Sequence, residues 1–234
     1  MDQNQLSDND KVFFNDGLRL ALAADRDGIS KKSLLQTTRQ AQDAIDGLVE
    51  ALSVEAKRQN VTLDCKKGCS WCCHQAIFAT SHEIHFMWEF MKLNFSEDDQ
   101  KLVVQTAFDN YQKRGRMSED ELLADKLACP LLKNGSCSVY PARPLTCRIY
   151  LSMSEPSCKT FFDKPNDKNN FPQLFEFPLQ AGRMLNEGLN SGLNETGLKS
   201  REMLLEEGLL LAHNNGEVEK DISLNELPLF NGAK

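Results

Sequence analysis

The residues most able to do chemistry are cysteines, four of which lie within the nine positions from Cys65 to Cys73. Thiols crowded in this way can form disulfides, act as nucleophiles, or bind a metal ion as thiolates. This first group consists of Cys65, Cys69, Cys72 and Cys73, and a second group follows at Cys129, Cys137, Cys147 and Cys158. All eight cysteines are candidate metal ligands.

Tetrahedral coordination limits how many ligands the first group can supply. Donors must surround a tetrahedral ion, whereas sulfurs from one short segment approach it from one side. Cys72 and Cys73 are adjacent, so both cannot face one ion without strain. We therefore expect two or three ligands from the first group and the remainder from the second. The segment 74–128 would then be a helical insertion whose ends are joined by metal.

The other two uses of the thiols are less well supported. The N-terminus, MDQNQLSDNDKVFF, has neither the basic nor the apolar region of a secretory signal. We therefore expect a cytoplasmic protein, and reducing conditions there disfavour disulfides. A thiol beside Lys or Arg could act as a nucleophile, but the sequence supplies no matching base and oxyanion arrangement. Metal binding is the favoured interpretation.

Ligand type alone leaves zinc and an iron–sulfur cluster as equal alternatives. Both accept four thiolates, and soft sulfur donors suit both. Eight cysteines could fill two mononuclear sites, or hold one cluster with thiols to spare. The spacing Cys65-x3-Cys69-x2-Cys72 also matches radical S-adenosylmethionine enzymes, but the repeated β/α alternation of their usual barrel is absent.

Three histidines are further candidate ligands. His74 follows the first cysteine group directly, but a role as a partly buried neighbour of the site is favoured over ligation. His82 and His85 are three residues apart on an expected helix, a spacing that can pair on a metal. Because no carboxylate completes the familiar zinc-protease arrangement, ordinary helix positions are favoured for both.

The overall charge argues against two classes of partner. The formal net charge is −7, which disfavours broad binding to nucleic acid or to anionic membranes. No apolar stretch approaches the ~20 residues that span a bilayer. The metal ion is the one partner that the sequence indicates.

The cysteines are embedded in two longer motifs. The first reads C-x-x-G-C-x-x-C-C, and the second reads C-P-x-L, then C-x-V-Y-x-x-R-P-x-x-C-R. Together they resemble the YkgJ-like cysteine-cluster family of zinc- or iron-chelating domains, over the range from Cys65 to Cys158. The resemblance implies metal binding. One branch of that family is linked to flagellin lysine methylation and an iron–sulfur cluster, so the alternative function is an S-adenosylmethionine-using, methyltransferase-like enzyme.

The elements that must position these cysteines are mostly helices. Apolar residues recur every three or four positions over about 9–24 and 30–60. Capping-box spacings begin further helices at Thr80–Glu83 and Ser118–Glu121, and Ser96 begins one that extends to about Arg114. Helix is expected again after Pro178 and over 196–213.

The segment from Cys129 to about Phe171 differs from the rest, because it holds most of the prolines and few periodic positions. Asn134-Gly135 predicts one small hairpin there. The Gly-Leu run in EGLNSGLNETGL is interpreted as a connection between two helices.

These patterns predict a mainly α protein: helices around an irregular cysteine-rich metal-binding core, with at most a small β-hairpin. We expect N-terminal helices over 1–60 and a cysteine-cluster domain over 61–175, with its helical insertion at 80–127. C-terminal helices and an acidic, loosely docked tail are expected over 176–234.

Overall fold

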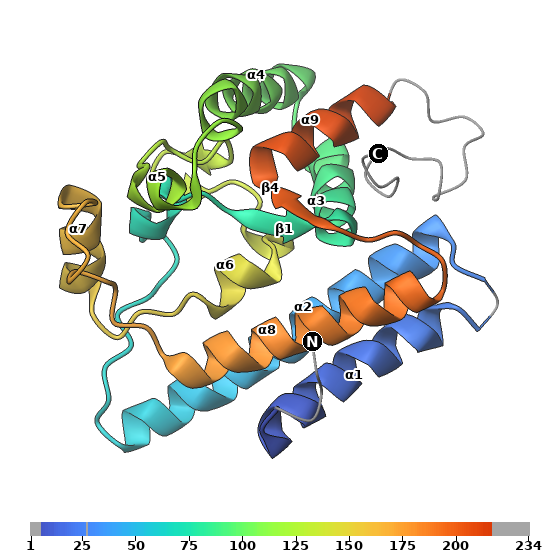
Figure 1. Cartoon of the computed structure of the whole chain (residues 1–234), viewed down its shortest axis with the longest axis horizontal. Coiled ribbons are helices and arrows are strands. Elements are labelled where there is room, and N and C mark those ends of the chain that lie inside the picture. Colours follow the sequence, from blue (N-terminus) through green and yellow to red (C-terminus); the bar gives the residue numbers. More distant parts are fainter. Residues whose placement is uncertain (1–5, 27, 217–234) are drawn as a thin grey trace.

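The computed structural model describes residues 6–26 and 28–216, and this part of the chain is mainly helical (Figure 1). Its strands form two small antiparallel pairs, β1 with β4 and β2 with β3. The prediction of a mainly α fold with a small hairpin is confirmed. The α-helices are α1 (Asp8–Ala24), α2 (Lys31–Arg58), α3 (Ser81–Asn94), α4 (Glu97–Arg114), α5 (Glu119–Ala124), α6 (Leu145–Ile149), α7 (Glu155–Asp163), α8 (Glu176–Glu195) and α9 (Leu205–Gly216).

Local capping residues determine where most of the early helices begin. The side chain of Ser30 accepts a hydrogen bond from the backbone N–H of Ser33 at the start of α2. Ser96 and Ser118 cap α4 and α5 in the same way. At α3, both the backbone N–H and the hydroxyl of Thr80 donate to Glu83 Oε2. These four predicted starts are confirmed, because an N-cap needs only residues adjacent in sequence.

The helices α1, α2 and α8 form one side of the molecule, and α1 and α8 pack closely along their length (Figure 1). Their contact requires glycine: a Cβ built on Gly188 would lie 1.9 Å from the carbonyl oxygen of Phe14, and one on Gly17 would lie 2.0 Å from that of Leu185. The prediction that the Gly-Leu run connects two helices is therefore wrong. Most of that run lies inside α8, where its glycines let the backbone of α1 approach.

The other side is built from α3, α4 and α9 around the ribbon of β1 (Phe78–Thr80) and β4 (Glu202–Leu204). Phe78 pairs with Leu204 and Thr80 with Glu202, so segments more than 120 residues apart are joined. The expected helix over 196–213 is wrong in its first half, because residues 202–204 are a strand and α9 begins only at Leu205.

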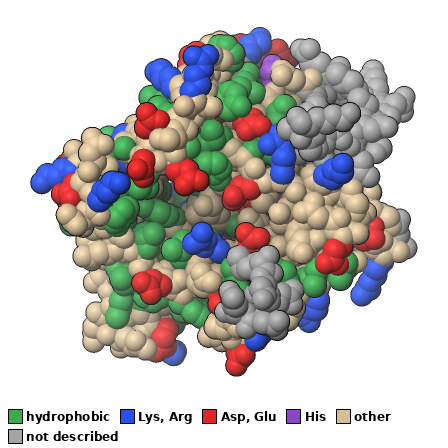
Figure 2. All heavy atoms as spheres, in the orientation of Figure 1, with side chains coloured by type: hydrophobic (Ala, Val, Ile, Leu, Met, Phe, Trp, Pro, Cys, Tyr) green, Lys and Arg blue, Asp and Glu red, His purple; other side chains and the backbone are tan. Residues whose placement is uncertain are grey.

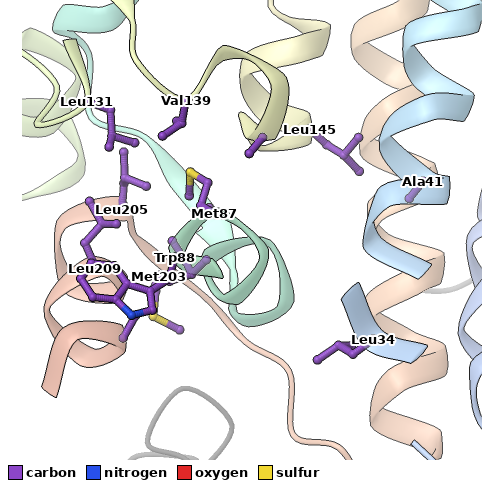
Figure 3. Close-up of a cluster of buried hydrophobic side chains, with 14 of the residues drawn as sticks. Leu34, Ala41, Met87, Trp88, Leu131, Val139, Leu145, Met203, Leu205 and Leu209 are labelled. Atoms are coloured by element: carbon purple, nitrogen blue, oxygen red, sulfur yellow. The ribbon is translucent and has the colours of Figure 1, made fainter. Parts of the chain in front are cut away.

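A continuous core joins the two sides and extends to the cysteine-bearing segments. Met87 and Trp88 of α3 lie with Leu205 and Leu209 of α9, and Leu131 and Val139 from the cysteine-rich segment lie nearby (Figure 3). The aromatic and Met-rich stretch of α3 therefore belongs to the core.

The predicted hairpin is confirmed. Strands β2 (Leu132–Lys133) and β3 (Ser136–Cys137) pair in antiparallel fashion across Asn134 and Gly135. Both turn residues have positive φ, 51° and 73°, as a two-residue turn of the type favoured by Asn-Gly requires. This turn places Cys137 on the second strand.

Among residues 6–26 and 28–216, no helix combines the length and apolar character needed to cross a bilayer. The predicted acidic tail lies largely outside the described residues.

Candidate metal centre

The first cysteine group occupies a turn followed by a single turn of 3-10 helix, η2 (Trp71–His74). Gly68, with φ of 93°, turns the chain so that the N–H of Cys69 donates to the carbonyl of Lys66. The N–H of Cys65 donates to the carbonyl of Ser152 at 3.2 Å, which ties this turn to the second cysteine segment.

The second group is spread over several short elements that return to the first. The N–H of Cys129 donates to the carbonyl of Cys73 at 2.7 Å, so the two ends of the 74–128 insertion meet directly. Cys137 lies on β3, Cys147 on α6 and Cys158 on α7. The structure thus brings two distant thiol segments together, as the metal hypothesis requires.

Seven of the eight thiols line one cavity of about 180 Å³. They are Cys65, Cys69, Cys72, Cys73, Cys129, Cys137 and Cys147. Cys158 is buried on α7 but is not among the residues that line this cavity. Apolar side chains, including Leu131, Val139 and Leu205, complete the walls.

The thiols share a cavity without forming a closed ligand shell. Within the described ranges, no three His, Cys, Asp or Glu side chains are arranged as a metal-holding group. The donor chemistry fits a soft metal ion, because seven sulfurs surround one largely apolar space.

Burial and mutual repulsion raise the pKa of most of these thiols. Burial raises the pKa of Cys129 and Cys147 far above the usual range, and raises that of Cys65, Cys69 and Cys137 as well. A bound cation must displace these protons, since the ligand form is the thiolate.

Cys72 is central to the group. Its pKa is raised first by the hydrogen bond with the Cys73 thiol and then by burial. Repulsion from Cys72 in turn contributes to the raised pKa of Cys65, Cys69, Cys137, Cys147 and Cys158. Cys72 is thus within electrostatic range of both cysteine segments, and Cys158 belongs to this neighbourhood although it lies outside the cavity lining.

Two arginines near Cys147 in sequence, Arg143 and Arg148, have different surroundings. Arg143 lines the cavity, its guanidinium lies 4.0 Å from the centre of the Tyr140 ring, and its charge lowers the pKa of Cys147 and Cys72. Arg148 is buried and points away, forming an ion pair with Asp46 of α2. Arg143 therefore offsets thiolate charge, and Arg148 joins α6 to α2 while its charge also opposes the rise in the pKa of Cys137.

Glu83 is a positioning residue that the sequence indicates only in part. Its Oε2 caps α3, as the capping-box spacing predicts, and its Oε1 accepts a 2.6 Å hydrogen bond from the N–H of Leu145. Leu145 is the first residue of α6, the helix that carries Cys147. One buried carboxylate thus caps two helices, and the second contact has no signal in the sequence because 62 positions separate the two residues.

The other residues singled out from the sequence have structural partners. The ring of His74 lies 3.0 Å from the carbonyl of Ser70 and packs edge-on against Phe162. His82 is fully buried between the hydroxyls of Thr80 and Ser200. Neither His82 nor His85 lines the thiol cavity.

Fold and site together define a helical domain with a buried, thiol-lined cavity of the kind that binds soft metal ions. Residues 64–173, just under half of the chain, match the family model CxxCxxCC, described as "Putative zinc- or iron-chelating domain". This match confirms the resemblance seen in the two motifs. No curated protein and no solved structure gave a significant match.

Proposed function

We propose that the chain binds zinc or an iron–sulfur cluster through thiolates from both cysteine segments. The observation that carries this proposal is the convergence of seven thiols on one cavity, although a helical insertion separates the two segments in sequence. The proposed ligands come from these seven cysteines and from Cys158, which would join from the side of α7.

The surroundings suit a thiolate centre. Four thiolates around Zn²⁺ leave a formal charge of about −2, which is costly in a buried space unless it is offset. Arg143 supplies a positive charge at the cavity wall. Apolar side chains around the sulfurs exclude water and strengthen this electrostatic interaction.

The metal would also hold the fold together at this place. The cysteine segments contain only short elements: a 3-10 turn, a two-residue hairpin and the five-residue helix α6. Leu131, Val139 and Leu145 from these segments are buried in the core, and a structural zinc site would add ~10 to 16 kcal/mol. We propose that ligation organises residues 64–173 around the core that the helices provide.

Anaerobic purification followed by metal and acid-labile sulfide analysis tests the proposal. Stoichiometric zinc without sulfide would identify a zinc site, and iron with sulfide and absorbance near 400 nm would identify a cluster. A protein that acquires neither metal nor cluster, even after anaerobic reconstitution, would contradict the proposal. A cluster of ~4 Fe together with cleavage of S-adenosylmethionine would establish the enzymatic alternative.

A further inference from the structure

A second hollow lies on the other side of the wall that bounds the thiol cavity. It has a volume of about 390 Å³ and lies between the β1 region, β4 and α5. Phe78 and Leu123 are among its apolar lining residues, and they are 40% and 45% exposed. We refer to this hollow, lined by Gln75, Ala76, Phe78, Glu119, Leu122, Leu123 and Glu202, as the α5 groove.

The charged residues of the α5 groove are all acidic. Glu119 and Glu202 lie at its edge, and none of its seven lining residues is basic. Glu202 pairs with Thr80 across the ladder, so it is a diagonal neighbour of Phe78 on the same face. Figure 2 shows acidic side chains beside hydrophobic ones over the region of α5 and β4.

A cation placed nearby would stabilise the charged form of the Glu202 carboxylate. Its side chain is exposed, yet burial in the groove raises its pKa, and repulsion from Glu83 and Glu187 raises it further. Arg183 opposes this shift only as the smallest contribution. An added positive charge would remove an unfavourable interaction here as well as forming a new one.

The α5 groove and the thiol cavity share one wall. Ala76 and Phe78 line the groove, whereas Ile77 between them lines the thiol cavity, as alternation along an extended backbone requires. Gln75 lines the groove and donates a 3.1 Å hydrogen bond to the hydroxyl of Tyr150, which lines the cavity. A molecule in the groove would therefore contact the residues that separate it from the thiols.

We propose that the α5 groove is a docking site for a basic segment of a partner protein that inserts an apolar side chain between Phe78 and Leu123. Lysines or arginines on either side of that apolar anchor would face Glu119 and Glu202. Charge complementarity selects this occupant, because an acidic or nucleic-acid partner would be repelled by the same two carboxylates. Docking at this place does not require that the thiols hold metal, so the proposal stands apart from the proposed function.

Binding of model peptides, followed by ¹³C-methyl NMR on leucine-labelled protein, tests the proposal. The probe is the acetylated, amidated hexapeptide KLFKLK, and ELFELE is its charge-reversed counterpart. We expect KLFKLK to shift the methyl signals of Leu122 and Leu123, and ELFELE to leave them unchanged. Binding should weaken as salt is raised, because the pairing charges are exposed.

Variants locate the site. Glu119→Gln with Glu202→Gln should weaken KLFKLK binding by about fivefold or more, as expected for two partly exposed ion pairs. The matched control, Glu97→Gln with Asp98→Asn, removes two exposed acidic charges from the first turn of α4 and should leave binding unchanged.

Three results would overturn the proposal: no shift of Leu122 and Leu123, equal binding of both peptides, or equal weakening by the control pair. A fourth is a concentration-dependent dimer of the chain that Leu123→Ser abolishes, since it would assign the groove to a second copy. The peptides are tested on both metal-loaded and metal-free protein. Failure of the docking proposal is therefore distinguishable from failure of the metal proposal.

Discussion

The backbone N–H of Cys129 donates a 2.7 Å hydrogen bond to the carbonyl of Cys73. This contact closes the insertion that holds α3, α4 and α5, and it brings the last cysteine of one segment against the first cysteine of the next. The two thiol segments are thus joined by backbone hydrogen bonding before any metal is considered. A metal bound between them would reinforce a closure that the fold already makes.

Replacing Cys147 with Ser should lower metal content and thermal stability together. The half-buried thiol lines the cavity, and a serine hydroxyl is a poor ligand for a soft metal ion. Metal analysis and thermal unfolding of the same preparation measure both quantities. Cys158→Ser is the comparison: because Cys158 lies outside the cavity lining, its loss should cost less of each. Full metal content and an unchanged Tm in Cys147→Ser would contradict the ligand assignment.

Replacing Glu83 with Gln should destabilise the protein by ~1 to 3 kcal/mol, the usual cost of leaving a buried hydrogen-bonding group without a partner. The amide NH2 cannot accept, so either the Thr80 contacts or the Leu145 contact is lost. Urea unfolding measures the stability.

The same variant separates positioning from stability. Because Leu145 begins the helix that carries Cys147, Glu83→Gln should also weaken metal binding in competition with a chelator. Glu97→Gln, an exposed first-turn carboxylate on α4, serves as the control for charge. Weakened folding with unchanged metal affinity would show that Glu83 does not position the site.

Features decided by neighbours in sequence could be predicted, and those decided by distant contacts could not. Ser96, Ser118 and the Thr80–Glu83 box predicted helix starts, because capping joins residues two or three positions apart. The β1–β4 pair was missed, because strands of three residues carry no readable period and their pairing spans most of the chain. Coordination chemistry predicts the convergence of the cysteine segments. The hydrogen bond from the Leu145 N–H to Glu83 could not be predicted, because it depends on tertiary packing.

The Gly-Leu run shows how a local pattern can mislead. Glycine usually interrupts helices, so the run was interpreted as a connection. Glycine is instead required at position 188, because a side chain there would collide with the backbone of α1 at Phe14. The relevant partner lies more than 170 residues away, and only the folded structure shows it.

Two glycine variants test that explanation. Gly188→Ala should cost about 3 kcal/mol or more, because its Cβ would lie 1.9 Å from the Phe14 carbonyl oxygen and α1 must move away. Gly47→Ala on α2 is the matched control, since nothing lies within 4 Å of a Cβ built there. It should stabilise the protein by about 0.5 to 1 kcal/mol through helix propensity. Similar effects of both variants in urea unfolding would contradict close packing of α1 on α8.

His82 should make folding stability fall on mild acidification. Burial lowers its pKa to about 4, against an ordinary value of 6.5, because the charged imidazolium cannot be solvated in the core. The unfolded chain therefore binds a proton more readily than the folded one between these values. The contribution of His82 to the free energy of unfolding is therefore fully present above pH 6.5. It is lost as the pH falls towards 4, and the total loss is about 3 kcal/mol.

Comparison of His82→Gln with the wild type isolates this contribution. Glutamine can still hydrogen-bond to the hydroxyls of Thr80 and Ser200 but does not titrate, so the difference in unfolding free energy between the two proteins should change between pH 7 and pH 4. His213→Gln, whose native ring packs edge-on against Trp88, is the control for loss of an imidazole elsewhere in the chain. If His82→Gln loses stability on acidification as steeply as the wild type, then His82 is not the group that takes up the proton, and burial of a neutral imidazole there is the wrong account.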